Sequence, residues 1–161
     1  MNLSLENKVV LVTGASRGIG EAIALGVAKS GADVVIASRK IADLEKVAAE
    51  IKKTGRKCLA VAAHIGRTED IHNLVAKVME EFGRIDILIN NAATNPSMAS
   101  AIDIDERAWD SIMNLNLKGL YFLSQAVARV MKEKGGGKIV NVASIAGITP
   151  DILPVYASFG R

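Results

Sequence analysis

Five short runs of aliphatic and β-branched residues alternate along this sequence with longer segments of helical periodicity. The runs cover residues 8–13, 33–38, 57–62, 85–90 and 138–144. They show almost no alternation of polar and apolar residues, which is typical of parallel strands covered on both faces. Because each strand is followed by a helix, the order predicts a doubly wound α/β sheet with right-handed crossovers.

The segments between these runs carry apolar residues three and four positions apart, so each predicted helix presents one face to the sheet. The faces include Ile23 and Val27, residues 41–51 and residues 71–82, and a long helix is expected from about 105 to 134. Glycines at 31, 55, 83 and 135–137 follow these helices, where a left-handed residue closes the last turn.

The chain has 161 residues, half of them apolar, which is enough for one domain with its own core and too few for two. We therefore predict a single domain over 1–161, with five strands in the order 3-2-1-4-5. In that order the strand at 138–144 lies at an edge of the sheet. It is apolar after Lys138, so we expect it to seek a partner strand.

Charge and composition exclude several classes of partner. The net charge is +3 and the pI about 9.1, but basic and acidic residues are interspersed, which argues against a nucleic-acid face. No apolar run approaches the roughly 18 residues of a membrane span, and the N-terminus has no signal-peptide pattern. The single cysteine, Cys58, excludes an intrachain disulfide and is expected to pack at the start of a strand. These features favour a cytoplasmic protein with no membrane partner, and no metal site is predicted.

The strongest chemical signal is TGASRGIG at residues 13–20, which runs from a strand directly into a helix. Gly14 allows the tight turn, Gly18 lets the backbone approach a pyrophosphate, and Gly20 lets the helix pack closely. The helix N-terminus presents unpaired N–H groups to an anion. The loop is not a P-loop, because no Lys followed by Ser or Thr comes after its last glycine.

Several motifs together resemble one family. TGASRGIG, NNA at 90–92, NLKG at 116–119, IVNVASIAG at 139–147 and Tyr156 stand in the order and approximate spacing of the short-chain dehydrogenases/reductases. The resemblance extends from Lys8 to about Ser158. It implies that residues 1–161 form a dinucleotide-binding domain with a Rossmann-like fold, of which this chain lacks the family's C-terminal strands. It also implies hydride transfer between a nicotinamide cofactor and a carbonyl or alcohol substrate.

The cofactor can be predicted from charge at the end of the second strand. An acidic residue there would hold the ribose hydroxyls of NAD and repel a 2′-phosphate, but the chain has Ser38 followed by Arg39. Arg17 lies in the glycine loop, so two guanidinium groups can meet the 2′-phosphate, and NADP (NADPH) is the predicted cofactor. The resemblance adds further cofactor contacts at Ser16, Ile19, Asn91 and Ala92.

Two positions depart from the family pattern near the cofactor. His64 stands where the family often places an aspartate near the adenine, and we expect it to be a surface group without a catalytic role. Ala93 replaces the glycine that usually follows NNA and adds a methyl group beside the nicotinamide. The run NAATNP at 91–96 is similar to the carbonyl and retinal reductase branch, a hint about substrate.

The resemblance also implies the catalytic residues. Ser144 would orient the substrate oxygen, Tyr156 would be the acid and base, and Asn116 would kink the long helix and hold a water for proton relay. The pKa of a free tyrosine is about 10, so its anion needs a nearby cation. In the family a lysine four residues later supplies it, but position 160 is Gly160, and Arg161 would point about 140° away around a helix.

Three functions follow from these observations. The first is an NADP-dependent oxidoreductase with an incomplete active site. The second is a non-catalytic nucleotide-binding module that kept the glycine loop, and the third is an interaction fragment that pairs with full-length subunits through its open edge. Self-association is expected from the open edge. The resemblance adds to this, because the apolar stripe at 120–131 is normally paired in the family with the next helix and with a neighbouring subunit.

Overall fold

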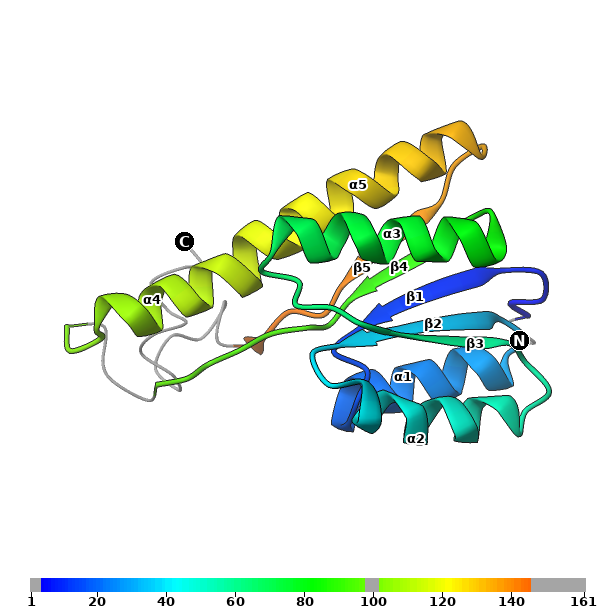
Figure 1. Ribbon diagram of the computed structural model, residues 1–161, viewed down its shortest axis with the longest axis horizontal. Coiled ribbons are helices and arrows are strands. Elements are labelled where there is room, and N and C mark those ends of the chain that lie inside the picture. The colour runs from blue at the N-terminus through cyan, green and yellow to red at the C-terminus, as the bar shows by residue number, and fades with distance from the viewer. Residues whose placement is uncertain (1–3, 98–101, 146–161) are drawn as a thin grey trace.

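The computed structural model describes residues 4–97 and 102–145, which form one parallel sheet with helices on both faces (Figure 1). The strands are β1 Val9–Thr13, β2 Asp33–Ser38, β3 Cys58–Ala62, β4 Ile87–Asn90 and β5 Lys138–Asn141. The helices are α1 Gly18–Lys29, α2 Ile41–Lys52, α3 Thr68–Phe82, α4 Glu106–Ile112, the π-helix η1 Met113–Gly119 and α5 Leu120–Glu133. The sheet order β3-β2-β1-β4-β5 confirms the predicted doubly wound topology.

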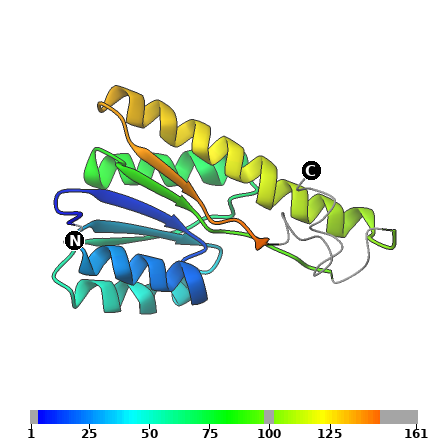
Figure 2. The same ribbon diagram turned by 180° about the vertical axis from the view of Figure 1, so that it is seen from behind.

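Helices α1 and α2 cover one face of the sheet, and α3 and α5 cover the other (Figures 1 and 2). Alternate residues of β1 pack against the two layers of helices, because successive side chains of a strand point to opposite faces of the sheet. Val10 and Val12 pack with α1 and α2, whereas Val9 and Leu11 pack with α3 and α5. All four are buried, which explains why the sequence of β1 shows no polar alternation.

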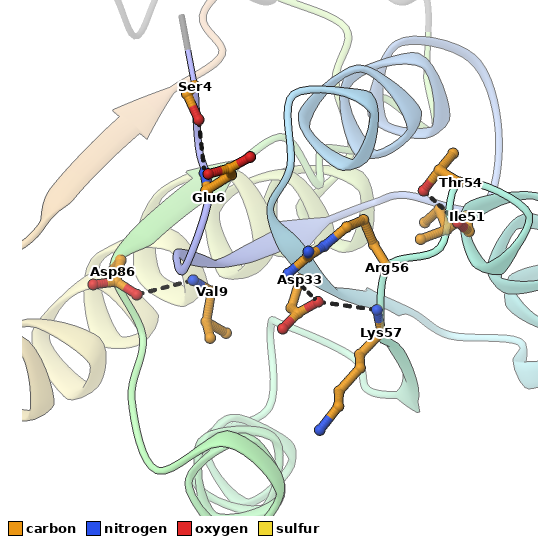
Figure 3. Close-up of polar contacts among 9 residues, drawn as sticks. All are labelled: Ser4, Glu6, Val9, Asp33, Ile51, Thr54, Arg56, Lys57 and Asp86. Carbon is orange, nitrogen blue, oxygen red and sulfur yellow. Dashed lines mark hydrogen bonds and ion pairs between the residues drawn. The ribbon is translucent and has the colours of Figure 1, made fainter.

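Two aspartates join the strands at the amino end of the sheet (Figure 3). Asp86 accepts a hydrogen bond from Val9 N at 2.9 Å, and Asp33 accepts one from Lys57 N at 3.0 Å. Partial burial acts to raise the pKa of Asp86, but the bonds from Arg84 and Val9 hold that pKa below its usual value. These contacts fix the strand register, so the amino end of the sheet is occupied by structural bonds.

The strand at the β5 edge is shorter than the predicted 138–144, since it ends at Asn141. One further bond, from Val142 N to Asn90 O at 2.9 Å, continues the ladder beyond it. All four residues of β5 are exposed, and within the described residues no strand pairs with its outer side. The predicted open edge is confirmed, but the expectation of cover on both faces is wrong for this strand.

The long helix predicted from about 105 to 134 is present but is not uniformly α-helical. Its middle, Met113–Gly119, forms π-helical turns between α4 and α5. Gly119 lies so close to the backbone of Ile65 that a side chain there would overlap the Ile65 carbonyl group. The irregularity that we predicted at Asn116 is therefore a π-helical segment packed against the loop after β3. Among the described residues no helix is long and apolar enough to cross a membrane.

Local signals in the sequence agree with the structure at the helix ends and at Cys58. Glycines 31, 55, 83, 135 and 136 all adopt positive φ after helices, as predicted, whereas Gly137 does not. Cys58 opens β3, and burial raises the pKa of its thiol to about 11, an effect that Lys52 only partly opposes. The thiol therefore behaves as a small apolar group.

Candidate functional site

A cleft of about 260 Å³ opens at the carboxyl ends of β1, β2, β3 and β4. Its lining consists of Gly14, Ser16, Arg17, Ala37, Ser38, Arg39, Ala63, His64, Ile65, Asn91, Ala92, Ala93, Thr94 and Leu115. Ligands of doubly wound sheets bind at this end, where the strand order reverses between β1 and β4. The fold therefore gathers most of the predicted cofactor-binding residues around one hollow.

The glycines of the loop 13–20 have three different surroundings. A side chain on Gly14, where φ is +65°, would come within 2.9 Å of Ala92 Cα. A side chain on Gly20 would overlap the carbonyl oxygen of Gly14, so α1 packs directly on the turn. Gly18, with φ +61°, has no atom near its missing side chain. The first and third glycines are thus required by packing, while the second faces open space from which a ligand can approach.

The N-terminus of α1 is open toward the same side. Arg17 is its N-cap, and the Arg17 side chain makes no capping hydrogen bond. The first N–H groups of α1 therefore carry the partial positive charge of a helix start without a side-chain acceptor. Ile19 stands in this first turn and is 66% exposed. Such a terminus fits a phosphate group.

A second hollow of about 400 Å³ adjoins the cleft between α1 and α2. It is lined by Ser16, Arg17, Glu21, Ser38, Arg39, Lys40, Asp43, Lys46 and Val47, with more basic than acidic side chains. Arg17 and Arg39 are exposed and line both hollows. Between them, the buried hydroxyl of Ser38 has no hydrogen-bond partner among the described residues. An unpaired buried hydroxyl beside two guanidinium groups fits a ligand that carries hydroxyl or phosphate oxygens.

The segment after β4 is bonded to the glycine loop. The Thr13 hydroxyl accepts from the N–H groups of Asn91 and Ala92 at 3.0 and 3.1 Å. The Asn91 amide donates to the carbonyl oxygens of Thr13 and Gly14 at 3.0 and 3.2 Å. The side chain of Asn91 is thus committed to the backbone, and it acts on a ligand by holding the cleft wall in place.

Asn116, at the centre of η1, makes two hydrogen bonds to one residue. Its Oδ1 accepts from Thr94 N at 2.8 Å, and its Nδ2 donates to Thr94 O at 2.9 Å. Both ends of the amide are used, so Asn116 fixes the chain where it leaves the cleft wall. This contact joins the π-helical segment to the β4 side of the site.

Of the other two predicted catalytic residues, the structure describes only Ser144. Ser144 follows β5 by three residues, is exposed, and is not among the residues that line the cleft. Tyr156 lies outside the described residues, as do Gly160 and Arg161. The described residues therefore assemble the predicted nucleotide site and Asn116, while the predicted roles of Ser144 and Tyr156 stay predictions.

His64 is the residue that the sequence reasoning misjudged. It was expected at the surface, yet it is half-buried and lines the cleft. Its position just past the end of β3 could have indicated this, because strand ends on that edge of the sheet all approach the ligand.

The sequence of the chain matches one family model and is similar to known proteins. The family model described as short chain dehydrogenase matches residues 8–158. Dehydrogenase/reductase SDR family member 4 of the rabbit, Oryctolagus cuniculus, is 41% identical over 146 residues, which cover 91% of this chain and 56% of that protein.

Solved structures agree closely with the fold. L-sorbose reductase from Gluconobacter frateurii, complexed with NADPH and L-sorbose, superposes with a TM-score of 0.92 at 33% identity, covering 98% of this chain and 60% of that one. NAD⁺-bound xylitol dehydrogenase superposes with a TM-score of 0.89 at 32% identity, covering 96% and 59%. The chain thus spans little more than half the length of the proteins that it resembles.

Proposed function

The chain belongs to the short-chain dehydrogenase/reductase family, and from this premise we propose that it is an NADP-dependent oxidoreductase. The reaction is hydride transfer between the nicotinamide and the carbon of a carbonyl or alcohol substrate. The bound cofactor supplies or accepts the hydride, and the residues of the chain hold the reactants and move the proton.

The site fits a dinucleotide by the chemistry of its groups. The open N-terminus of α1 beside Gly18 would hold the pyrophosphate, with Ser16 and Ile19 in the same turn. The loop at Asn91 and Ala92 would form the wall beside the nicotinamide half. Ser38 stands at the end of the second strand, where a residue of dinucleotide-binding folds contacts the ribose, so it would contact the ribose here.

The preference for the phosphorylated cofactor rests on one observation. Arg17 and Arg39 line both hollows around the unpaired Ser38 hydroxyl, and β2 ends without an acidic residue. Each charge-assisted bond to the 2′-phosphate contributes roughly 1.5 to 3 kcal/mol. Family membership alone does not decide this point, because L-sorbose reductase is complexed with NADPH and xylitol dehydrogenase with NAD⁺.

The proposed proton chemistry uses two residues, and a third holds the wall of the cleft. Tyr156 exchanges a proton with the substrate oxygen, Ser144 orients that oxygen, and Asn116 holds the neighbouring wall through Thr94. Gly160 offers no cation to lower the pKa of Tyr156, so we propose that turnover by this chain is slow. The glycine at position 160 also favours a second candidate function, a nucleotide-binding module without catalysis.

We further propose that the protein is cytoplasmic and self-associates. The free thiol of Cys58, half-buried at the start of β3, is consistent with a reducing compartment. The stripe expected at 120–131 does not support the self-association, because Leu123, Val127 and Met131 are buried against the sheet. The proposal rests on the exposed β5 edge, where Ile139 and Val140, at 38% and 48% exposure, offer backbone and apolar groups to a second subunit.

Titration of the chain with NADP and with NAD tests the cofactor proposal directly. We expect tighter binding of NADP, and equal affinity for the two cofactors would contradict it. Following the nicotinamide absorbance with NADPH and a panel of carbonyl compounds then distinguishes a slow enzyme from a module that only binds.

A further inference from the structure

Strand β5 has little burial to fix its pairing with β4. It lies along β4 at the edge of the sheet (Figure 2), and all four of its residues are exposed. Register is strongly specified only where one face of a strand is buried. Between Lys138 and Ser144 the chain is apolar except at Asn141, so sliding it along β4 would exchange one apolar residue for another. Another contact is needed to define which residues of the two strands lie opposite each other.

Asn90, the last residue of β4, makes that contact. It is only 4% exposed, and it is the partner of Asn141 in the sheet. Its Nδ2 donates to Asn141 Oδ1 and to Ser124 Oγ on α5, each at 2.9 Å. Both hydrogens of the amide are thus used, and the three side chains join β4, β5 and α5.

The connection before β5 limits the direction in which the strand can slip. It runs from Glu133 to Lys138 through three consecutive glycines. A side chain on the last of them, Gly137, would overlap Met131 Sδ, so this end of the connection is packed on α5. The short connection cannot give up two residues to the strand, but it can take up two residues from it.

The competing register therefore places Ala143 opposite Asn90 and Val140 opposite Ile87. A shift of two residues keeps every side chain of the strand on its own face of the sheet. The one polar loss is at Asn90, because alanine offers no side-chain acceptor to its amide. A buried donor without an acceptor disfavours this register by about 5- to 100-fold.

The register decides where Ser144 lies. Residues of a strand are about 3.3 Å apart, so the slip would carry Ser144 about 6.6 Å along β4, beyond the reach of a hydrogen bond. We propose that Asn141, through its bond to Asn90, is the positioning residue that sets the register of β5 and thereby the place of Ser144. The role toward Ser144 rests on the proposed function, in which this hydroxyl orients the substrate oxygen. The register itself does not depend on that function.

Disulfide trapping measures the register. In a Cys58→Ala background the chain has no other cysteine. Ile87→Cys with Lys138→Cys reports the observed pairing, and Ile87→Cys with Val140→Cys reports the slipped one, because a disulfide needs Cα atoms closer than about 7 Å. Oxidation in a glutathione buffer followed by mass spectrometry gives the ratio of slipped to observed crosslink. We expect the observed pair to crosslink at least about fivefold more than the slipped pair.

Four substitutions, each added to both cysteine pairs, test the role of the amide. Asn141→Leu should raise the ratio by about fivefold or more, because both registers then leave the Asn90 amide without this acceptor. Asn141→Asp keeps an acceptor oxygen and should return the ratio to within about twofold of its original value. Ser124→Ala removes the other acceptor and should lower the stability to urea without changing the ratio. Asn73→Leu, the same change of side chain at an exposed position of α3, is the matched control and should leave the ratio unchanged.

Turnover of the trapped forms tests the role toward Ser144. With Asn141→Leu in place, the chain trapped in the observed register should oxidise NADPH with a carbonyl compound at least about tenfold faster than the chain trapped in the slipped register. Both trapped forms should bind NADP equally, because the cofactor cleft lies on β1 to β4.

Three results would overturn the register role. They are an unchanged ratio in Asn141→Leu, an Asn141→Asp variant that behaves like Asn141→Leu, and an equal change in Asn73→Leu, which would report a general loosening. Equal rates in the two trapped forms would refute the role toward Ser144. If no form binds NADP or turns over, the proposed function fails and the role toward Ser144 falls with it, while the crosslink ratio still decides the register.

Discussion

The half of the sheet with β1, β2 and β3 and the half with β5 differ in how completely the rest of the chain covers them. In β2 the four central residues are buried, and the strand lies between β1 and β3 beneath α2. In β5 every residue is exposed, and the strand pairs only with β4 within the described residues. The side with β1, β2 and β3 therefore holds its cleft through its own contacts, whereas the β5 side offers a surface for further contacts.

This contrast separates binding from chemistry. The glycine loop, Ser38, Arg39 and His64 all belong to the covered side, and the loop after β4 is bonded to that side through Thr13. Ser144 follows the uncovered strand, and Tyr156 lies further along the chain. We therefore expect cofactor binding to withstand changes that abolish turnover.

The largest expected effect is on the turnover rate, and it tests the separation of cofactor binding from chemistry. A chimera with Gly160→Lys and the C-terminal segment of the rabbit relative should reduce carbonyl compounds at least about a hundredfold faster than this chain. The reason is that one positioned acid–base contribution is worth about 10² to 10⁴ in rate. NADPH absorbance measures the rate, and both proteins should bind NADP alike.

A second chimera that keeps glycine at position 160 isolates the lysine, and it should stay slow. If the unextended chain already turns over at an ordinary rate of about 10 per second, the proposed need for a cation beside Tyr156 is wrong.

The next effect concerns charge on the covered side. Arg39→Ala should narrow the preference for NADP over NAD by roughly 1.5 to 3 kcal/mol, because one guanidinium contact to the 2′-phosphate is lost. Titration of both cofactors measures the change. Arg129→Ala, an exposed arginine on α5, should leave the preference intact, and an equal loss in both variants would point to a general charge effect.

Two glycines of α1 test how tightly the covered side is packed. Gly20→Ala should lower the free energy of unfolding by about 1 to 3 kcal/mol, because the new methyl group overlaps the Gly14 carbonyl. Gly26→Ala, in the same helix with open space around it, should raise it by about 0.5 to 1 kcal/mol. Urea unfolding gives both values, and a stabilised Gly20→Ala variant would contradict the close contact.

The smallest effect concerns the uncovered side. Light scattering should report a dimer or larger species, and Val140→Lys should weaken the association by about 1 kcal/mol by placing a charge on the edge. Ile41→Lys, at the start of α2 and similarly exposed at 42%, is the control and should associate normally. A protein that stays monomeric would refute the predicted self-association.

The sequence predicted the sheet because its signals are local and independent of packing. Apolar runs such as 33–38 and glycines such as Gly83 specify a strand or a helix end wherever they occur. Strand ends are less predictable, because β5 stops at Asn141 although the apolar pattern continues. Motif spacing predicted part of the cleft lining, such as Gly14, Ser38 and Asn91. It did not predict the π-helical turns, since periodicity is read on an α-helical template. His64 was misjudged because its burial depends on Gly66, Arg67 and Asp70 in a loop with no pattern of its own.

The π-helical segment has a consequence for how the length of this chain can vary. The buried residues run from Ala108 in α4 to Met131 in α5, and in an ideal α-helix this span would rotate the apolar face by about 140°. With one residue fewer the rotation would be only about 40°, so a regular helix could keep both ends on the sheet.

The buried faces of α4 and α5 would therefore tolerate a deletion between Met113 and Gly119, but Leu115 would shift from its contact with the core and Asn116 would lose the irregular turn from which it reaches Thr94. The extra residue is needed for the contact of Asn116 with Thr94, and it is not needed to align the buried faces of α4 and α5. In a lineage that no longer needed the site, this is where we would expect a one-residue gap to appear first.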